Sequence, residues 1–120
     1  MRVLFNAMQA GNRSGTGRHT VELLRALAAL PDGPELAAAW PADVEHPENC
    51  GAVQFEVLPA SHGRRLLADQ FALPRLAARS GVDALHYPAN VGVLRAAGCP
   101  VLLTIHDLSF LHHPEWFRWE

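Results

Sequence analysis

The chain has 120 residues, of which 49 % are hydrophobic and 18 % charged, a composition typical of one globular domain. Its formal net charge of -2 offers no basic field to nucleic acid. All ten basic residues are arginines, so a P-loop NTPase and Schiff-base chemistry, which both need a lysine, are excluded. Cys50 and Cys99 lack metal-site spacing, and no run reaches the ~20 apolar residues that span a bilayer. We therefore expect a cytoplasmic protein whose only membrane contact would be peripheral, at the inner face of the cytoplasmic membrane.

Strands and helices alternate from the first residues onward. A short buried strand is predicted over residues 2–6, and a loop rich in glycine and asparagine follows over 7–17. Apolar residues at helical spacing predict an amphipathic helix from about residue 16 to residue 30. Two further strands are expected over residues 35–40 and 53–57, the second because apolar and polar residues alternate there.

The second half of the chain continues the alternation. A helix is predicted over about 64–79, with a kink or a division into two shorter helices at Pro74. Residues 84–87 and 101–105 are predicted strands, and the run at 101–105 is the most convincing buried strand of the chain. A proline at a first-turn position predicts a last helix over 115–120.

This order of elements predicts an α/β fold, a Rossmann-like parallel sheet with right-handed crossovers and helices on both faces. Ligands of such sheets bind beyond the carboxyl ends of the strands. Three segments should therefore converge on one edge of the sheet. They are the loop after the first strand, the residues after Tyr87, and the pair His106-Asp107.

The loop at residues 12–19, Asn-Arg-Ser-Gly-Thr-Gly-Arg-His, has the composition of a phosphate site. Glycines between a strand and a helix let the backbone approach a ligand, and the free N–H groups of the first helical turn then face an anion. Arg18, together with Arg13, would add charge that matches phosphate oxygens. The alternative is a tight strand-to-helix turn that binds nothing, since glycine is common in such turns.

The same glycines raise the question of a nicotinamide dinucleotide. Gly15 and Gly17 match the first two glycines of the dinucleotide fingerprint, but Thr20 stands where the third belongs. The acidic residue that should follow about 20 positions later has only Asp43 as a candidate, in a proline-rich loop. An NAD(P)-dependent oxidoreductase domain is therefore kept as an alternative that lacks part of its motif.

His106 and Asp107 follow the predicted strand at 101–105 and would face the cleft. An imidazole can orient a hydroxyl or donate to a reacting oxygen at neutral pH. The Asp107 carboxylate could hold the tautomer of the ring or bind a sugar hydroxyl itself. The alternative is that His106 only caps the strand end through a backbone contact. His112 and His113 add ring nitrogens, but their spacing matches no zinc pattern, so no metal is expected.

Three stretches resemble glycosyltransferase family 4, the retaining sugar-nucleotide enzymes. Residues 15–24, GTGRHTVELL, are similar to the family's G-[IT]-G-R-[YH]-x-x-x-L-L opening, and residues 83–88, DALHYP, to its D-[VL]-[FLI]-H-x-P strand end. Residues 103–110, LTIHDLSF, with HPEWF at 113–117, are similar to its T-[IV]-H-D-L-x-[FY] and H-P-x-x-[FY] segments. The three stretches occur in the family's order and spacing and span nearly the whole chain.

The resemblance implies a GT-B fold, in which two Rossmann-like domains enclose the active site and the N-terminal one mainly receives the acceptor. Residues 1–120 would then form an incomplete N-terminal, acceptor-side domain, and the nucleotide-sugar domain would lie outside this chain. The full-length protein is expected to be a hexosyltransferase, for example of polysaccharide biosynthesis, that uses no cofactor and no metal. The 120-residue piece alone is expected to be inactive.

The resemblance also implies roles for particular residues. Those expected near the donor diphosphate are Gly15, Thr16, Gly17 and Arg18. His106 would lie near the transferred sugar, with Asp107 as the second catalytic residue. Those expected on the acceptor side are Asn12, Arg13, His19, His86 and Tyr87.

The expected partners are a nucleotide-sugar donor and a glycan, lipid-linked or small-molecule acceptor. Two other hypotheses stay open. The chain could be a stand-alone module that holds a phosphorylated ligand at residues 15–18, or an interaction domain that docks through the aromatic residues Trp116, Phe117 and Trp119. An exposed edge of a truncated sheet would also offer a surface for a dimer.

Overall fold

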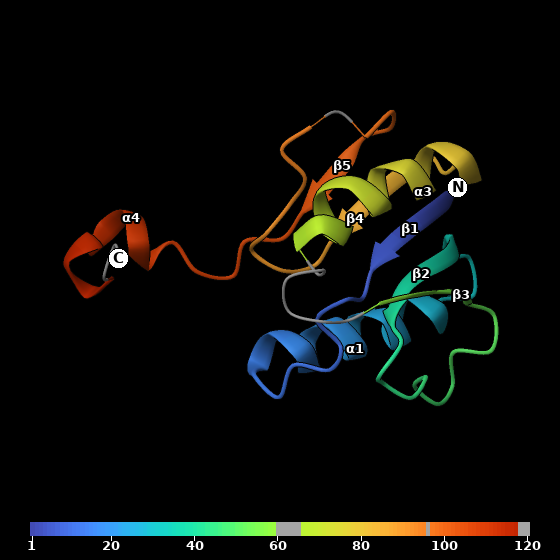
Figure 1. Ribbon diagram of the computed structural model, residues 1–120. Helices are drawn as coiled ribbons and strands as arrows, with labels where there is room; N and C mark the ends of the chain where they lie inside the picture. The colour runs from blue at the N-terminus through green and yellow to red at the C-terminus, as the bar shows by residue number, and fades with distance from the viewer. Residues whose placement is uncertain (60–65, 96, 118–120) are drawn as a thin grey trace.

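The computed structural model describes residues 1–59, 66–95 and 97–117. In this part of the chain five strands form one sheet in the order β3-β2-β1-β4-β5, and every neighbouring pair is parallel. The strands are β1 (Arg2–Asn6), β2 (Glu35–Pro41), β3 (Gln54–Leu58), β4 (Ala84–Tyr87) and β5 (Val101–Leu103). The predicted α/β, Rossmann-like sheet is therefore confirmed, with β1 in its centre (Figure 1).

Helices cover both faces of the sheet, as predicted (Figure 1). The helical segments are α1 (Gly15–Ala28), the π-helical η1 (Ala68–Ala72), α3 (Leu73–Ser80), α4 (Ser109–His112) and the 3₁₀ turn η2 (Pro114–Trp116). Helix α1 lies on one face of the sheet, and η1 continues into α3 on the other. No helix in the described ranges is both long enough and apolar enough to cross a bilayer.

The two-sided core follows from the alternation of side chains along β1. Val3 and Phe5 point to one face and pack in a cluster with Leu24 of α1. Leu4 points to the other face and packs in a cluster with Leu73 of α3. Consecutive apolar residues in β1 are therefore needed, because both faces of this strand are buried.

The helix predicted over 64–79 changes from π-helical to α-helical hydrogen bonding next to Pro74, the position at which the sequence predicted an irregularity. The N–H of Leu73 bonds to the carbonyl of Ala68, which is the wider π-helical spacing, and α3 then begins with Pro74 in its first turn. Proline is tolerated there because the N–H groups of a first turn have no partner within the helix. The irregularity predicted near Pro74 is therefore present as a π-helical turn, but the backbone stays helical from η1 through Leu73 into α3 and does not divide into two separate helices. The predicted start at residue 64 lies outside the described residues.

The prediction of a buried strand over 101–105 was wrong in length and in burial. β5 ends at Leu103, and the side chains of Val101, Leu102 and Leu103 are 40, 59 and 39 % exposed. Among the described residues β5 pairs with β4 alone and forms the edge of the sheet. An apolar run predicts a strand, but it does not reveal whether neighbouring elements cover that strand.

The helix predicted over 115–120 was wrong for residues 115–117, and its remaining residues, 118–120, lie outside the described residues. A single α-helical turn, α4, forms earlier, and the 3₁₀ turn η2 follows it. Phe117 then has the extended dihedral angles φ -111° and ψ 129°, while Trp119 lies outside the described residues. We refer to residues 104–117 as the arm, which reaches away from the sheet (Figure 1). Short helices without tertiary packing are marginal in water, and the exposed arm has little such packing.

Candidate functional site

The tracts that the sequence analysis expected to converge do so. His106 lies three residues beyond β5, and its ring contacts the ring of His19 in α1, with centroids 4.5 Å apart and an angle of 84° between the rings. We use the name glycine loop for residues 12–19, whose last five residues already belong to α1. Because His19 stands only two residues after Gly17, the start of the arm lies against the first turns of α1. We call this edge, where β1, β4 and β5 end, the rim.

Gly15 and Gly17 both lie in the first turn of α1, which begins earlier than the sequence predicted, and they have different structural roles. A Cβ atom on Gly17 would lie 1.8 Å from the carbonyl oxygen of Asn12, so only glycine fits there without a shift of the backbone. A Cβ atom on Gly15 would meet nothing within 4 Å. The N-cap residue Ser14 makes no side-chain hydrogen bond, and the first turn of α1 contains no acidic residue. The N–H groups of this turn therefore have no side-chain cap, as an anion-binding helix start requires.

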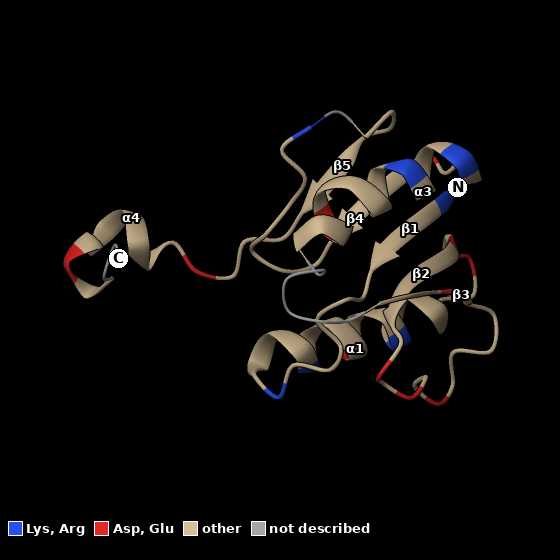
Figure 2. Ribbon diagram, in the orientation of Figure 1, with Lys and Arg blue, Asp and Glu red and all other residues tan. Residues whose placement is uncertain are grey.

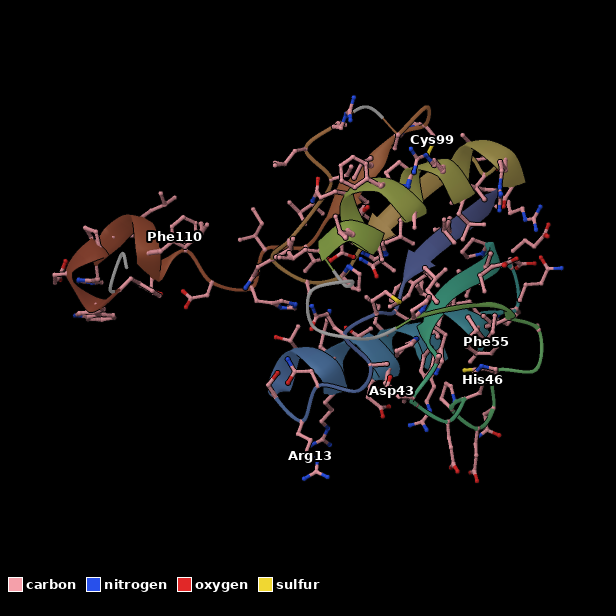
Figure 3. The ribbon with its side chains drawn as sticks, viewed as in Figure 1. Arg13, Asp43, His46, Phe55, Cys99 and Phe110 are labelled. Carbon is pink, nitrogen blue, oxygen red and sulfur yellow. The ribbon has the colours of Figure 1, made fainter. Side chains whose placement is uncertain are left out.

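Two arginines flank the glycine loop. The side chains of Arg18 and Arg13 are exposed, and neither makes an ion pair or a hydrogen bond with a described residue. Figure 3 shows Arg13 pointing away from the sheet. The side-chain oxygen of Asn12 accepts a hydrogen bond from the N–H of Ser14 at 3.1 Å and shapes the loop. Arg18 directly precedes His19, whose ring contacts His106 at the rim.

The backbone holds His106 at two points. Its N–H donates to the side-chain oxygen of Asn90 at 2.7 Å, and its ring Nε2 lies 2.8 Å from the carbonyl oxygen of Pro88. Nε2–H is therefore the donor of this pair, which leaves Nδ1 as the ring nitrogen that can accept a hydrogen bond. The backbone contact considered in the sequence analysis is present, and the side chain is nevertheless largely exposed.

Asp107 does not hold the tautomer of His106, because the carbonyl of Pro88 does. Its two carboxylate oxygens instead accept from the N–H and the hydroxyl of Ser109, both at 2.7 Å. These hydrogen bonds lower the pKa of the Asp107 carboxyl. Asp107 is thus an ionised, exposed residue that shapes the start of α4, and its catalytic role stays a prediction.

His86 lies just beneath the rim. It is 8 % exposed, packs edge-on against Phe5, and places Nε2 3.4 Å from the hydroxyl of Thr104. Burial, and secondly the nearby His19, lowers the pKa of His86. A neutral His86 therefore connects β4 to the start of the arm, and its acceptor-side role stays a prediction.

Tyr87 belongs to a buried polar network under the rim. It is fully buried, and its hydroxyl donates to the backbone carbonyl of Asp69 at 2.7 Å. Burial, and then the charges of Asp69 and Cys99, raise the pKa of Tyr87. The side-chain amide of Asn6 donates to the Asp69 carboxylate at 2.8 Å. Tyr87 is therefore a structural residue in this network, and its acceptor-side role stays a prediction.

Comparison with known families now identifies the chain. The family described as Glycosyltransferase Family 4 matches residues 13–120, nearly its full length. The chain belongs to glycosyltransferase family 4. A glycosyltransferase-type function follows in general terms, and the parallel sheet with helices on both faces agrees with a Rossmann-like part of a GT-B enzyme. No curated protein and no solved structure matches the chain.

The dinucleotide alternative is not supported in this glycosyltransferase. β1 ends at Asn6 and α1 begins only at Gly15, whereas the glycines of a dinucleotide fingerprint form the turn that directly follows the strand. Thr20 is fully buried, and its hydroxyl donates to the carbonyl of Thr16 at 2.9 Å, so a side chain packs where the fingerprint needs glycine. Asp43 is exposed and lies two residues beyond β2 (Figure 3).

His19 is the least satisfied polar residue of the rim. Its ring Nε2 is shielded from solvent and has no hydrogen-bond partner among the described residues. Buried polar atoms in native proteins are usually paired, so an unpaired one at a candidate site indicates a place for a ligand or a water molecule. The acceptor-side role of His19 stays a prediction.

The histidines of the arm are engaged locally. His113 pairs with Glu115 at 3.0 Å and stacks on the ring of Trp116 at 4.0 Å. Within the described ranges no three His, Cys, Asp or Glu side chains form a group that could hold a metal. Trp116 and Phe117 are exposed, 67 and 41 % respectively, and their proposed role in an interface stays a prediction.

Four residues that shape the rim were missed from the sequence. Asn6 and Asp69 form the buried pair described above, and Asn90 and Thr104 bind the backbone of His106 and the ring of His86. A signal existed for two of them. Asn6 is the polar residue that ends the apolar run of β1, and Asp69 is the single acid of a mainly apolar helical stretch at residues 66–73.

Proposed function

We propose that this chain is the acceptor-side half of a retaining family 4 glycosyltransferase. The enzyme would move a hexose from a nucleotide-sugar donor to a glycan, lipid-linked or small-molecule acceptor. The observation that carries the proposal is the 4.5 Å contact between the rings of His19 and His106. This contact brings the first turns of α1 and the segment after β5 to one rim, where a reacting group can meet both.

In this proposal the start of α1 receives the diphosphate of the leaving nucleotide. The uncapped N–H groups of its first turn would stabilise the negative charge that develops there. So would the guanidinium of Arg18, which has no ion-pair partner in the part of the chain that the structure describes. Gly15 leaves open space beside these donors, and Gly17 holds the loop close to the helix. Thr16 lies in the same first turn. Electrostatic stabilisation of the leaving group requires no metal at this site.

His106 would position the transferred sugar. Its Nε2 is engaged with the backbone, so Nδ1 is the atom that would accept a hydrogen bond from a sugar hydroxyl. A bound ligand would also supply the missing partner of His19 Nε2. The ionised carboxylate of Asp107 stands next in the chain and could accept from a second hydroxyl.

A second, nucleotide-sugar-binding domain completes the site in this proposal, so residues 1–120 alone would not turn over. The exposed apolar side chains of β5 and of the arm are surfaces that further parts of the enzyme would cover. We place the enzyme in the cytoplasm, with any membrane contact peripheral.

Replacement of His106 by Ala in the complete enzyme tests the proposal. Turnover, measured as release of nucleoside diphosphate from the donor, should fall by more than about tenfold, since one positioned group contributes about 10²–10⁴-fold in many enzymes. His112→Ala, also an exposed histidine of the arm, is the matched control and should keep normal turnover. Near-normal turnover of the His106 variant would refute its role. Nucleoside diphosphate binding without any transfer would favour the binding-module alternative.

A further inference from the structure

Two hollows adjoin on the helical stretch formed by η1 and α3. The first, of about 230 Å³, lies at the carboxyl end of β3 and is lined by apolar side chains such as Leu58, Leu67 and Phe71. The second, of about 260 Å³, is lined chiefly by Gln70, Phe71, Arg75 and Arg95. Phe71 and Arg75 line both hollows. An apolar space and a cationic space therefore share one wall.

The two arginines of the second hollow have no counter-charge among the residues that the structure describes. Arg75 and Arg95 make no ion pair or hydrogen bond with any residue in the described ranges. The guanidinium carbon of Arg95 lies 5.9 Å from the centre of the Phe71 ring. Glu56 lines a neighbouring hollow together with Arg75 but forms no ion pair with it. Figure 2 shows basic segments on α3 and on the loop between β4 and β5. Two uncompensated guanidinium groups favour an anion between them.

Gln70 fixes the loop that carries Arg95. Its side-chain amide donates to the carbonyl of Gly92 at 2.9 Å, and its oxygen accepts from the N–H of Leu94 at 2.9 Å. The preceding residue, Asp69, belongs to the buried network beneath the rim. The hollows are therefore built on the same helical segment that supports the rim, and the backbone next to Arg95 is held in place before a ligand binds.

We propose that the two hollows form one site for an amphiphilic anion. A phosphate or diphosphate would lie between Arg75 and Arg95, and an attached alkyl or prenyl chain would pack beside Phe71 in the apolar hollow. The leucines at positions 66 and 67 are 61 and 58 % exposed and extend the apolar surface next to it. That such an anion is the acceptor of sugar transfer rests on the proposed function, whereas the binding site itself does not.

Calorimetric titration of the complete protein with decyl phosphate tests the site. The decyl phosphate is kept below the concentration at which it forms micelles, and no nucleotide-sugar donor is added. Decyl phosphate should bind. Inorganic phosphate should bind more than about tenfold more weakly, because burial of about two methylene groups of the alkyl chain accounts for such a factor. Decyl maltoside, which has the alkyl chain but no negative charge, should show no comparable affinity. Arg75→Gln and Arg95→Gln should each weaken binding by about threefold to tenfold. Arg79→Gln, which removes an arginine of α3 that lines neither hollow, should change affinity by less than about twofold.

Equal affinity for decyl maltoside, or unchanged binding after both glutamine substitutions in a folded protein, would overturn the proposal. Equal affinity for inorganic phosphate and decyl phosphate would overturn the proposal that an alkyl chain packs in the apolar hollow. His106→Ala should bind decyl phosphate as the unmodified protein does, so the two proposals fail separately. Absence of binding together with normal sugar transfer would overturn this site alone.

Discussion

The closest backbone approach in the glycine loop makes Gly17 a sensitive point of the fold. A Cβ atom there would lie 1.8 Å from the carbonyl oxygen of Asn12 and 2.9 Å from that of Gln9. Both are backbone atoms, and the N–H of Asn12 bonds to the carbonyl of Gln9 at 2.9 Å, so the loop cannot yield by rotating a side chain. To reach even 3.0 Å, the limit below which real Cβ contacts are essentially never found, the loop would have to move by about 1.2 Å.

We therefore expect Gly17→Ala to lower the free energy of unfolding by about 2 kcal/mol. Overpacking costs about 1–3 kcal/mol, and a clash with backbone belongs in the upper part of that range. The higher helix propensity of alanine returns about 0.5–1 kcal/mol. Gly15→Ala is the matched control, because the same atom added there meets nothing within 4 Å. It should change stability by less than about 0.5 kcal/mol, or stabilise slightly.

Urea unfolding followed by far-ultraviolet circular dichroism measures both variants under the same conditions. A lower midpoint for Gly17→Ala, with an unchanged midpoint for Gly15→Ala, is the expected result. If the two variants unfold at the same urea concentration, the close approach between the loop and α1 does not constrain the fold, and the two glycines would have no distinct structural roles.

Two titrations test the groups beneath the rim. Tyr87 is the single tyrosine of the chain, and burial raises the pKa of its hydroxyl. Near-ultraviolet absorbance at about pH 10 should therefore show almost no phenolate in the folded protein, whereas the tyrosine of the urea-unfolded chain should be about half ionised. Half ionisation of Tyr87 in the folded protein would contradict its burial. Burial lowers the pKa of His86 below its unfolded value of about 6.5, so below that pH the unfolded chain binds more protons and the free energy of unfolding should fall as the pH is lowered from about 7.5 to about 5. His86→Phe should reduce this pH dependence, and an unchanged slope in urea titrations would speak against it.

The fold and the rim were predictable because they depend on local signals and on a topological rule. The apolar run Val3–Phe5 and the short segment 84–87, which ends at a proline, indicate strands whatever their partners are. Once the strands are parallel, their carboxyl ends must meet at one edge, which brings the glycine loop and His106 together without any knowledge of side-chain contacts.

The remaining features depend on contacts that sequence spacing does not encode. Asn6 and Asp69 are 63 positions apart, and neither position alone indicates the other. Asp107 bonds to Ser109 in a turn that competes with its predicted contact to the neighbouring imidazole. The exposure of Leu102 reflects the absence of a covering element among the described residues, which an apolar run cannot report.

The buried link from Asn6 through Asp69 to Tyr87 has a mechanical consequence. It joins the last residue of the central strand, the helix on one face of the sheet and the end of β4 through three buried residues, with Tyr87 bonded to the backbone carbonyl of Asp69 and Asn6 to its carboxylate. Strand ends joined in this way should keep their spacing whether or not a substrate is present. The strand ends would then form a rigid base for the rim, and only the loops and the arm next to it would need to rearrange when a substrate binds.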